Sequence, residues 1–139
     1  MIILDTNVLS EGMRPEPQAA VQAWLQTVDP ADLAITTITI AEILYGVALL
    51  PRGRRRTDLE LRFRSFVTRV IDDRVLAFDT PAAEHYAIIA AQRRAAGRPA
   101  SQADIMVAAI AAANGARIAT RNVTDFADFG VPVIDPWNH

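Results

Sequence analysis

Three acidic side chains lie where predicted strands end or predicted helices begin. Asp5 directly follows the apolar run 2–4, which predicts a buried strand. Glu42 lies in the first turn of one predicted helix, and Asp104 lies in the first turn of another, which opens at Ser101. Carboxylates gathered at one sheet edge would repel one another unless they were protonated or neutralised by a cation. Mg²⁺ or Mn²⁺, which take oxygen ligands, are the natural neutralising ions.

Further polar groups follow the predicted strand 117–120. Asn122 comes directly after it, and Asp125 lies one helical turn further on. Nothing favours zinc, because the chain has no cysteine and its two histidines are His85 and His139. The acids and amide therefore predict an oxygen-ligand metal site.

A purely structural interpretation stays open for each acid alone. Thr39-x-x-Glu42 has the spacing of a capping box, with Thr39 as the cap. Ser101-x-x-Asp104 has the same spacing, and Asp5 could be a plain N-cap. A carboxylate at a helix start also gains about 0.3–1 kcal/mol from the helix dipole. Only the joint placement of the acids favours a functional site.

The composition excludes several classes of protein. The 139 residues are 51% hydrophobic and carry a net charge of −2. With no cysteine there is no disulfide scaffold or thiol nucleophile, and with no lysine there is no P-loop or Schiff base. The longest apolar run, 105–113, is too short to span a membrane. With no leader pattern at Met1, we expect a soluble, cytoplasmic protein without a membrane partner.

Short apolar runs alternate with helical patterns along the chain. This predicts an α/β fold, in which a central parallel sheet of four to five strands is flanked by helices on both faces, in a single domain over 1–139. The strands are expected at 2–4, 34–37, 75–78 and 117–120, with a fifth candidate at 131–134. Helices are expected near 21–28, 39–49, 59–71, 81–97 and 101–113, with Thr80 capping the fourth.

Four motifs in this order resemble the PIN domain, and more narrowly the VapC toxins of bacterial toxin–antitoxin pairs, including their FitB-like branch. They are Ile2-Ile3-Leu4-Asp5-Thr6-Asn7, Thr39-Ile-Ala-Glu42-Ile43, Ala103-Asp104 and Ala119-Thr120-Arg121-Asn122. The resemblance implies a single PIN domain with a Mg²⁺- or Mn²⁺-dependent endoribonuclease activity. It also implies a homodimer and a small cognate antitoxin with a DNA-binding domain, so that DNA is contacted only through the antitoxin.

The resemblance assigns roles residue by residue. Asp5, Glu42 and Asp104 match the three acidic positions that would hold the metal and activate water for attack on the phosphodiester. Many relatives have aspartate where this chain has Asn122, so either Asn122 or Asp125 serves the fourth position, and one or two ions could act.

Two hydroxyl residues, Thr6 and Thr120, resemble those that line the family's pocket, and with Asn122 they are expected to contact the acids or the phosphate.

Two groups of arginines remain. Arg52, Arg54, Arg55 and Arg56 form a basic loop that is either merely solvated or contacts RNA or an antitoxin's acidic tail. Arg93, Arg94 and Arg98 are interpreted as a solvated helix end.

The second functional hypothesis is a weakly active PIN-fold subunit that acts mainly with its antitoxin in a DNA-bound regulatory complex. The absence of a charge at Asn122 keeps it open.

Overall fold

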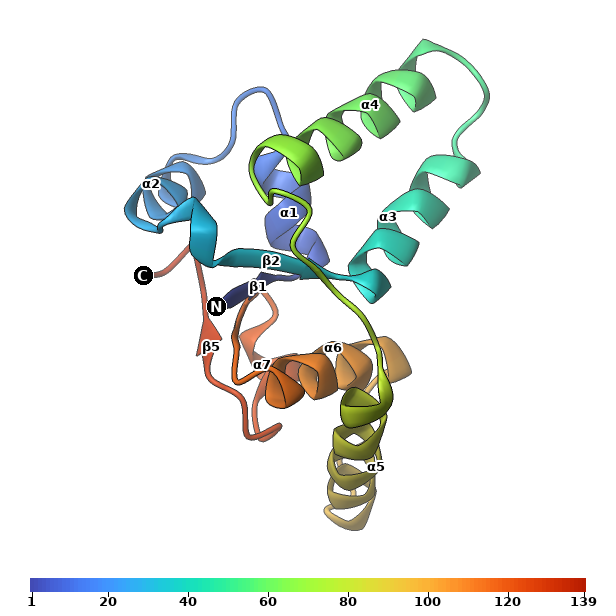
Figure 1. The fold of residues 1–139 in the computed structure, drawn as a ribbon, viewed down its shortest axis with the longest axis vertical. Coiled ribbons are helices and arrows are strands. Elements are labelled where there is room, and N and C mark those ends of the chain that lie inside the picture. Colours follow the sequence, from blue (N-terminus) through green and yellow to red (C-terminus); the bar gives the residue numbers. More distant parts are fainter.

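A computed structural model describes residues 1–139 and contains one five-stranded sheet in the order β3-β2-β1-β4-β5 (Figure 1). Every neighbouring pair of strands is parallel. The strands are β1 (Ile2–Leu4), β2 (Leu33–Thr36), β3 (Val75–Leu76), β4 (Arg117–Ala119) and β5 (Val133–Ile134). The predicted fold class is therefore confirmed, including the fifth strand.

Seven α-helices and one short 3-10 helix cover the sheet. On one face lie α1 (Thr6–Gly12), α2 (Ala19–Thr27), α3 (Thr37–Leu49) and α4 (Arg54–Arg69), and on the other α5 (Thr80–Ala95), α6 (Gln102–Ala113) and α7 (Val123–Phe126) (Figure 1). The 3-10 helix, η1 (Pro30–Asp32), precedes β2. No helix is both long enough and apolar enough to cross a membrane.

Side-chain alternation along β1 divides the core into two clusters. Ile3 packs with α5, α6 and α7, whereas Ile2 and Leu4 pack with the helices of the opposite face. The middle of α6 is buried almost all round, as its apolar sequence predicts, and this helix lies between the sheet and α5. The apolar contacts on both faces hold the strand ends, and the residues that follow them, in fixed places.

Several local predictions are wrong. Thr36, not Thr39, caps α3, because its side chain accepts a hydrogen bond from the backbone N–H of Thr39 at 3.1 Å. Glu42 therefore lies beyond the capping position and is free of any capping role. Asp79, not Thr80, caps α5 through a 3.1 Å hydrogen bond from the N–H of Ala82.

The predicted basic loop is also partly helical, since Arg54, Arg55 and Arg56 form the first turn of α4 after Gly53. Gly53 has φ +152°, a conformation that favours glycine and lets the chain turn sharply into α4.

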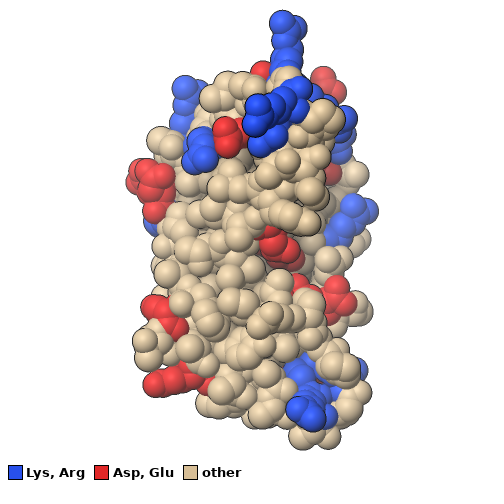
Figure 2. All heavy atoms as spheres, turned by 90° about the vertical axis from the view of Figure 1, so that its right-hand side faces the viewer, with Lys and Arg blue, Asp and Glu red and all other residues tan.

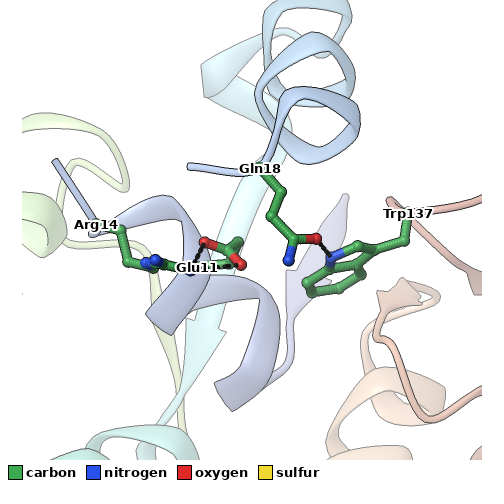
Figure 3. Close-up of polar contacts among 4 residues, drawn as sticks. All are labelled: Glu11, Arg14, Gln18 and Trp137. Carbon is green, nitrogen blue, oxygen red and sulfur yellow. Dashed lines mark hydrogen bonds and ion pairs between the residues drawn. The ribbon is translucent and has the colours of Figure 1, made fainter. Parts of the chain in front are cut away.

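The C-terminal segment is attached to the start of α2. The indole Nε1 of Trp137 donates a 2.6 Å hydrogen bond to Gln18 (Figure 3), and the Arg121 guanidinium lies 4.9 Å from the centre of the Trp137 ring. On α1, the buried Glu11 pairs at 3.2 Å with Arg14, which lies in the turn after the helix (Figure 3). The contacts of Trp137 hold the end of the chain against the start of α2 and against Arg121, in the segment that follows β4.

Candidate active site

The site lies where the strand order reverses. From β1 the chain continues to β2 on one side, while β4 pairs with the other side of β1. In open parallel sheets ligands bind beyond the carboxyl ends of the strands at this point. Asp5 follows β1 and Thr120 follows β4, and the Asp5 N–H donates to the Ala119 carbonyl oxygen at 2.9 Å.

The carboxylate of Asp5 is buried and held by its neighbours. The side chain is 7% exposed, and its Oδ2 accepts a 2.8 Å hydrogen bond from the Thr120 hydroxyl. Burial raises the pKa of Asp5, and the charges of Asp104 and Glu42 raise it further, against the lowering effect of hydrogen bonds from Thr120 and from the Thr6 backbone. Although Asp5 occupies the N-cap position of α1, its side chain makes no capping bond.

Asn7 belongs to the site, although no role was predicted for it. Its Nδ2 lies 3.4 Å from Asp5 Oδ2 and 3.5 Å from the Thr120 hydroxyl, and its Oδ1 accepts from the Arg121 N–H at 3.1 Å. Thr120 also accepts the backbone N–H of Asn122 at 3.0 Å. Asn7 therefore links the start of α1 to the segment that follows β4. It also lies against the Thr120 hydroxyl, the other group that donates a hydrogen bond to Asp5.

Glu42 reaches the site from α3. Its Oε1 accepts a 2.8 Å hydrogen bond from the Thr6 hydroxyl, and its side chain is exposed. Glu42 and Thr6 border a pocket of about 330 Å³ that extends to Arg55 and Arg62 on α4. Arg62 was not predicted. It lies two helical turns beyond Arg55 and faces the same pocket, so the helical period of α4 is the signal that points to it.

Asp104 stands on the other side, at the start of the buried helix α6. The Ser101 hydroxyl accepts its backbone N–H at 3.1 Å, so this half of the predicted capping box is confirmed. Burial raises the pKa of Asp104, and the charge of Asp125 adds to the rise. Asp104 and Asp125 line a second pocket of 330 Å³, and Arg93 lines it with them.

The acids influence one another but do not form a closed cage. The charges of Asp104 and Glu42 contribute to the raised pKa of Asp5, and the charge of Asp125 contributes to the raised pKa of Asp104. No three acidic or histidine side chains are gathered closely enough to hold a metal ion by themselves. The carboxylates of Asp5, Glu42 and Asp104 are hard oxygen donors, the type that Mg²⁺ and Mn²⁺ prefer, and they could hold such an ion only with further ligands.

Asn122 lies at the edge of this arrangement. It precedes α7 without capping it, and its side chain is exposed. Asp125, which follows on α7, lines the same pocket as Asp104, and Asn122 does not. Which of the two serves the fourth acidic position stays a prediction.

Basic side chains flank the acidic region. Figure 2 shows acidic side chains midway along this face and arginines at its two ends, the upper of which corresponds to the tip formed by α3 and α4. Of the predicted cluster, Arg52, Arg54 and Arg55 are exposed, and Arg56 lies 3.5 Å from the Leu50 carbonyl oxygen. None of the four pairs with a carboxylate, so their charge is available to an anionic partner.

Residues 2–131 match the PIN domain family, and the chain belongs to that family. It is 40% identical to the VapC ribonuclease of Sinorhizobium fredii over 99% of this chain and 98% of that protein. It is 38% identical to the toxin FitB of Neisseria gonorrhoeae over 99% of both chains.

Solved structures extend the comparison to the fold. The crystal structure of FitAcB from Neisseria gonorrhoeae matches with a TM-score of 0.91 at 37% identity, over 100% of both chains. A structure of FitAB bound to a DNA fragment matches with a TM-score of 0.90 at 37% identity, over 100% of this chain and 97% of that one. The resemblance inferred from the four motifs is thus confirmed at the level of the family.

Proposed function

We propose that this chain is the toxin of a toxin–antitoxin pair and acts as a metal-dependent endoribonuclease. The observation that carries the proposal is the buried Asp5 at the reversal of strand order. Thr120 donates a hydrogen bond to its carboxylate, and the negative charges of Asp104 and Glu42 repel it. Such an arrangement is costly unless a cation neutralises it. The similarity to a VapC ribonuclease and to FitB supports RNA as the substrate and toxicity as the outcome.

Asp5 and Asp104 would hold Mg²⁺, or Mn²⁺ in its place, with Glu42 contributing directly or through water. When bound, the ion supplies a Lewis acid for the phosphate oxygens and lowers the pKa of the attacking water.

The chain's own groups position the reactants. Thr120 and Asn7 fix the Asp5 carboxylate, so that it is oriented before substrate arrives. Thr6 holds Glu42 Oε1, which leaves Oε2 free to orient the attacking water. As the water oxygen bonds to phosphorus, the bond from phosphorus to the leaving ribose oxygen breaks. Glu42 takes the proton that the attacking water loses, and a solvent water protonates the leaving oxygen. Asp125, which lines a pocket with Asp104, would act beside it.

Recognition of the RNA backbone falls to the arginines. Arg55 lines the pocket that begins at Glu42, and Arg54 lines a neighbouring pocket together with it. Arg52 and Arg56 lie beside them in sequence, and each guanidinium of the cluster can bind a phosphate through two hydrogen bonds. The same cluster is a candidate contact for an acidic antitoxin segment. The exposed Tyr45 and Leu49 on α3, 67% exposed each, provide apolar surface for a homodimer rather than core.

The regulatory alternative also has an observation in its favour. FitAB has been solved on DNA, and the acids here do not close a metal cage without help. In that case the chain acts chiefly as a subunit of a DNA-bound complex, with DNA contacted through the antitoxin.

Induced expression in a bacterial host separates the two functions. We expect wild type to arrest growth with loss of RNA, and D5N, produced at the same level, to leave growth unchanged. Equal toxicity of wild type and D5N contradicts the nuclease, and absence of toxicity from both favours the regulatory subunit.

A further inference from the structure

The guanidinium of Arg93 lines the pocket of Asp104 and Asp125 without pairing with either acid. Arg93 comes from α5, on the opposite face of the sheet from the α4 arginines. No carboxylate oxygen lies within 4.0 Å of it, whereas Arg98 pairs with Asp128. The charge of Arg93 therefore borders the acidic pocket and is not neutralised by an ion pair with Asp104 or Asp125.

The side chain is nevertheless held in one orientation. Its Nη1 donates a 3.0 Å hydrogen bond to the Ala127 carbonyl oxygen, and its Cζ lies 4.8 Å from the centre of the Phe129 ring. Arg93 lies in the last turn of α5, as predicted, but it is half-buried rather than fully solvated. An oriented guanidinium loses little entropy when it binds a ligand.

One donor of Arg93 has no acceptor. Its Nε is buried and is the only buried side-chain nitrogen or oxygen atom without a hydrogen-bond partner. A ligand in the pocket cannot reach this enclosed atom, but Nη2 makes no hydrogen bond and is not among the buried unpartnered atoms, so it is the free donor of the guanidinium. A phosphodiester would supply an oxygen acceptor for Nη2 and a negative charge for the guanidinium.

We infer that Arg93 binds a phosphate of the RNA strand that enters the pocket of Asp104 and Asp125. Resting on the proposed function, this makes Arg93 a substrate-binding residue on the α5 side of the site, while the α4 arginines bind the strand from the other side. Arginines would thereby bind the phosphates of the RNA strand on both sides of the acidic residues.

Equilibrium RNA binding tests the inference. The probe is a fluorescently labelled single-stranded RNA oligonucleotide of mixed sequence, followed by anisotropy in chelator so that it stays intact, at several salt concentrations. We expect R93Q, which removes the charge and the guanidinium donors, to weaken binding about tenfold and to reduce the salt slope by about 0.7, the loss of one phosphate contact on a single strand. The matched control is R94Q, because Arg94 is the exposed neighbour that lines no pocket. It should stay within about twofold of wild type.

Thermal unfolding of the same variants separates binding from bracing. A lower Tm for R93Q with an unchanged salt slope means that Arg93 only braces Phe129, which overturns the inference. If R93Q does not fold, R93K replaces it, because lysine keeps the charge but lacks the planar guanidinium. RNA binding by R93K should weaken about threefold with an unchanged salt slope. An unchanged affinity of R93K overturns the inference. If wild type binds and cleaves RNA and R93Q has the same RNA affinity and salt slope as R94Q, this inference alone is refuted. Wild type that binds no RNA refutes the proposed function as well.

Discussion

The hydrogen bond from Thr120 to Asp5 offers a quantitative test of the site's geometry. Thr120 is fully buried, and its hydroxyl donates to Asp5 Oδ2 at 2.8 Å and accepts the Asn122 N–H at 3.0 Å. The substitution T120V keeps the shape of the side chain and removes these two interactions, together with the weaker 3.5 Å contact from Asn7 Nδ2. It leaves a buried carboxylate without its main donor and a backbone N–H without its acceptor.

The expected loss follows from these two contacts. A hydrogen bond to a charged group contributes about 1.5–3 kcal/mol, and an unsatisfied buried group costs about 1–3 kcal/mol. We therefore expect T120V to lower the free energy of unfolding by about 3 kcal/mol at pH 7. For a chain of 139 residues this lowers Tm by roughly 10 °C.

The loss depends on pH because it requires the ionised carboxylate. Burial raises the pKa of Asp5, while the Thr120 hydrogen bond acts in the opposite direction by favouring the charged form. The contribution of Thr120 is therefore full above the pKa of Asp5. As the pH falls through that pKa, it decreases toward the value of a neutral hydrogen bond, about 0.5–1.5 kcal/mol.

Urea unfolding of wild type, T120V, D5A and the double variant measures the coupling between the two side chains. We expect a coupling energy of about 1.5–3 kcal/mol at pH 7 and a smaller one in acid. T68V is the matched control, since Thr68 is exposed on α4, and it should change stability by less than about 0.5 kcal/mol. Additive effects of T120V and D5A, or a coupling independent of pH, would refute the reasoning.

Three further outcomes follow from the site. Mg²⁺ or Mn²⁺ should raise the Tm of wild type in thermal scans, by the equivalent of about 2.7 kcal/mol at a hundred times the dissociation constant; an equal rise in D104N contradicts the ligand assignment. Because burial raises the pKa of Asp5 in the folded state, the ionised carboxylate destabilises the fold. In chemical unfolding, the stability of D5N relative to wild type should therefore increase as the pH rises from the ordinary pKa of 3.8 through the raised one, and a constant difference contradicts this. Phe126 is 1% exposed and packs edge-on against Phe129 at 5.7 Å, so F126A should cost about 3–5 kcal/mol and reduce cleavage by displacing Asp125; full activity in F126A argues against a role for α7.

The central part of the fold could be predicted because its signals are local and strong. The apolar run 2–4 can only be a buried strand, and the nearly uniform apolar character of α6 requires burial on most sides. Since residues after parallel strands share an edge, Asp5 and the end of the strand 117–120 could be placed together, whereas a contact of Thr120 with the acids was implied only by the family resemblance.

The remaining features depend on tertiary contacts. Thr36 and Thr39 both satisfy the sequence preference for a cap, and only the register of β2 decides that Thr36 takes the role. The short helices α1 and α7 carry too few residues to show a helical period.

The contacts of two side chains were missed for the same reason. Asn7 depends on a partner at Thr120 and Arg93 on Phe129, both distant in sequence.

Cleavage of RNA by the purified chain, freed of any antitoxin, tests the central claim most directly. The reactions contain Mg²⁺, Mn²⁺ or chelator, with D5N run beside wild type. The account predicts cleavage by wild type with either metal, none with chelator and none by D5N. Cleavage that survives in chelator, or that D5N retains, would contradict a metal-dependent nuclease centred on Asp5.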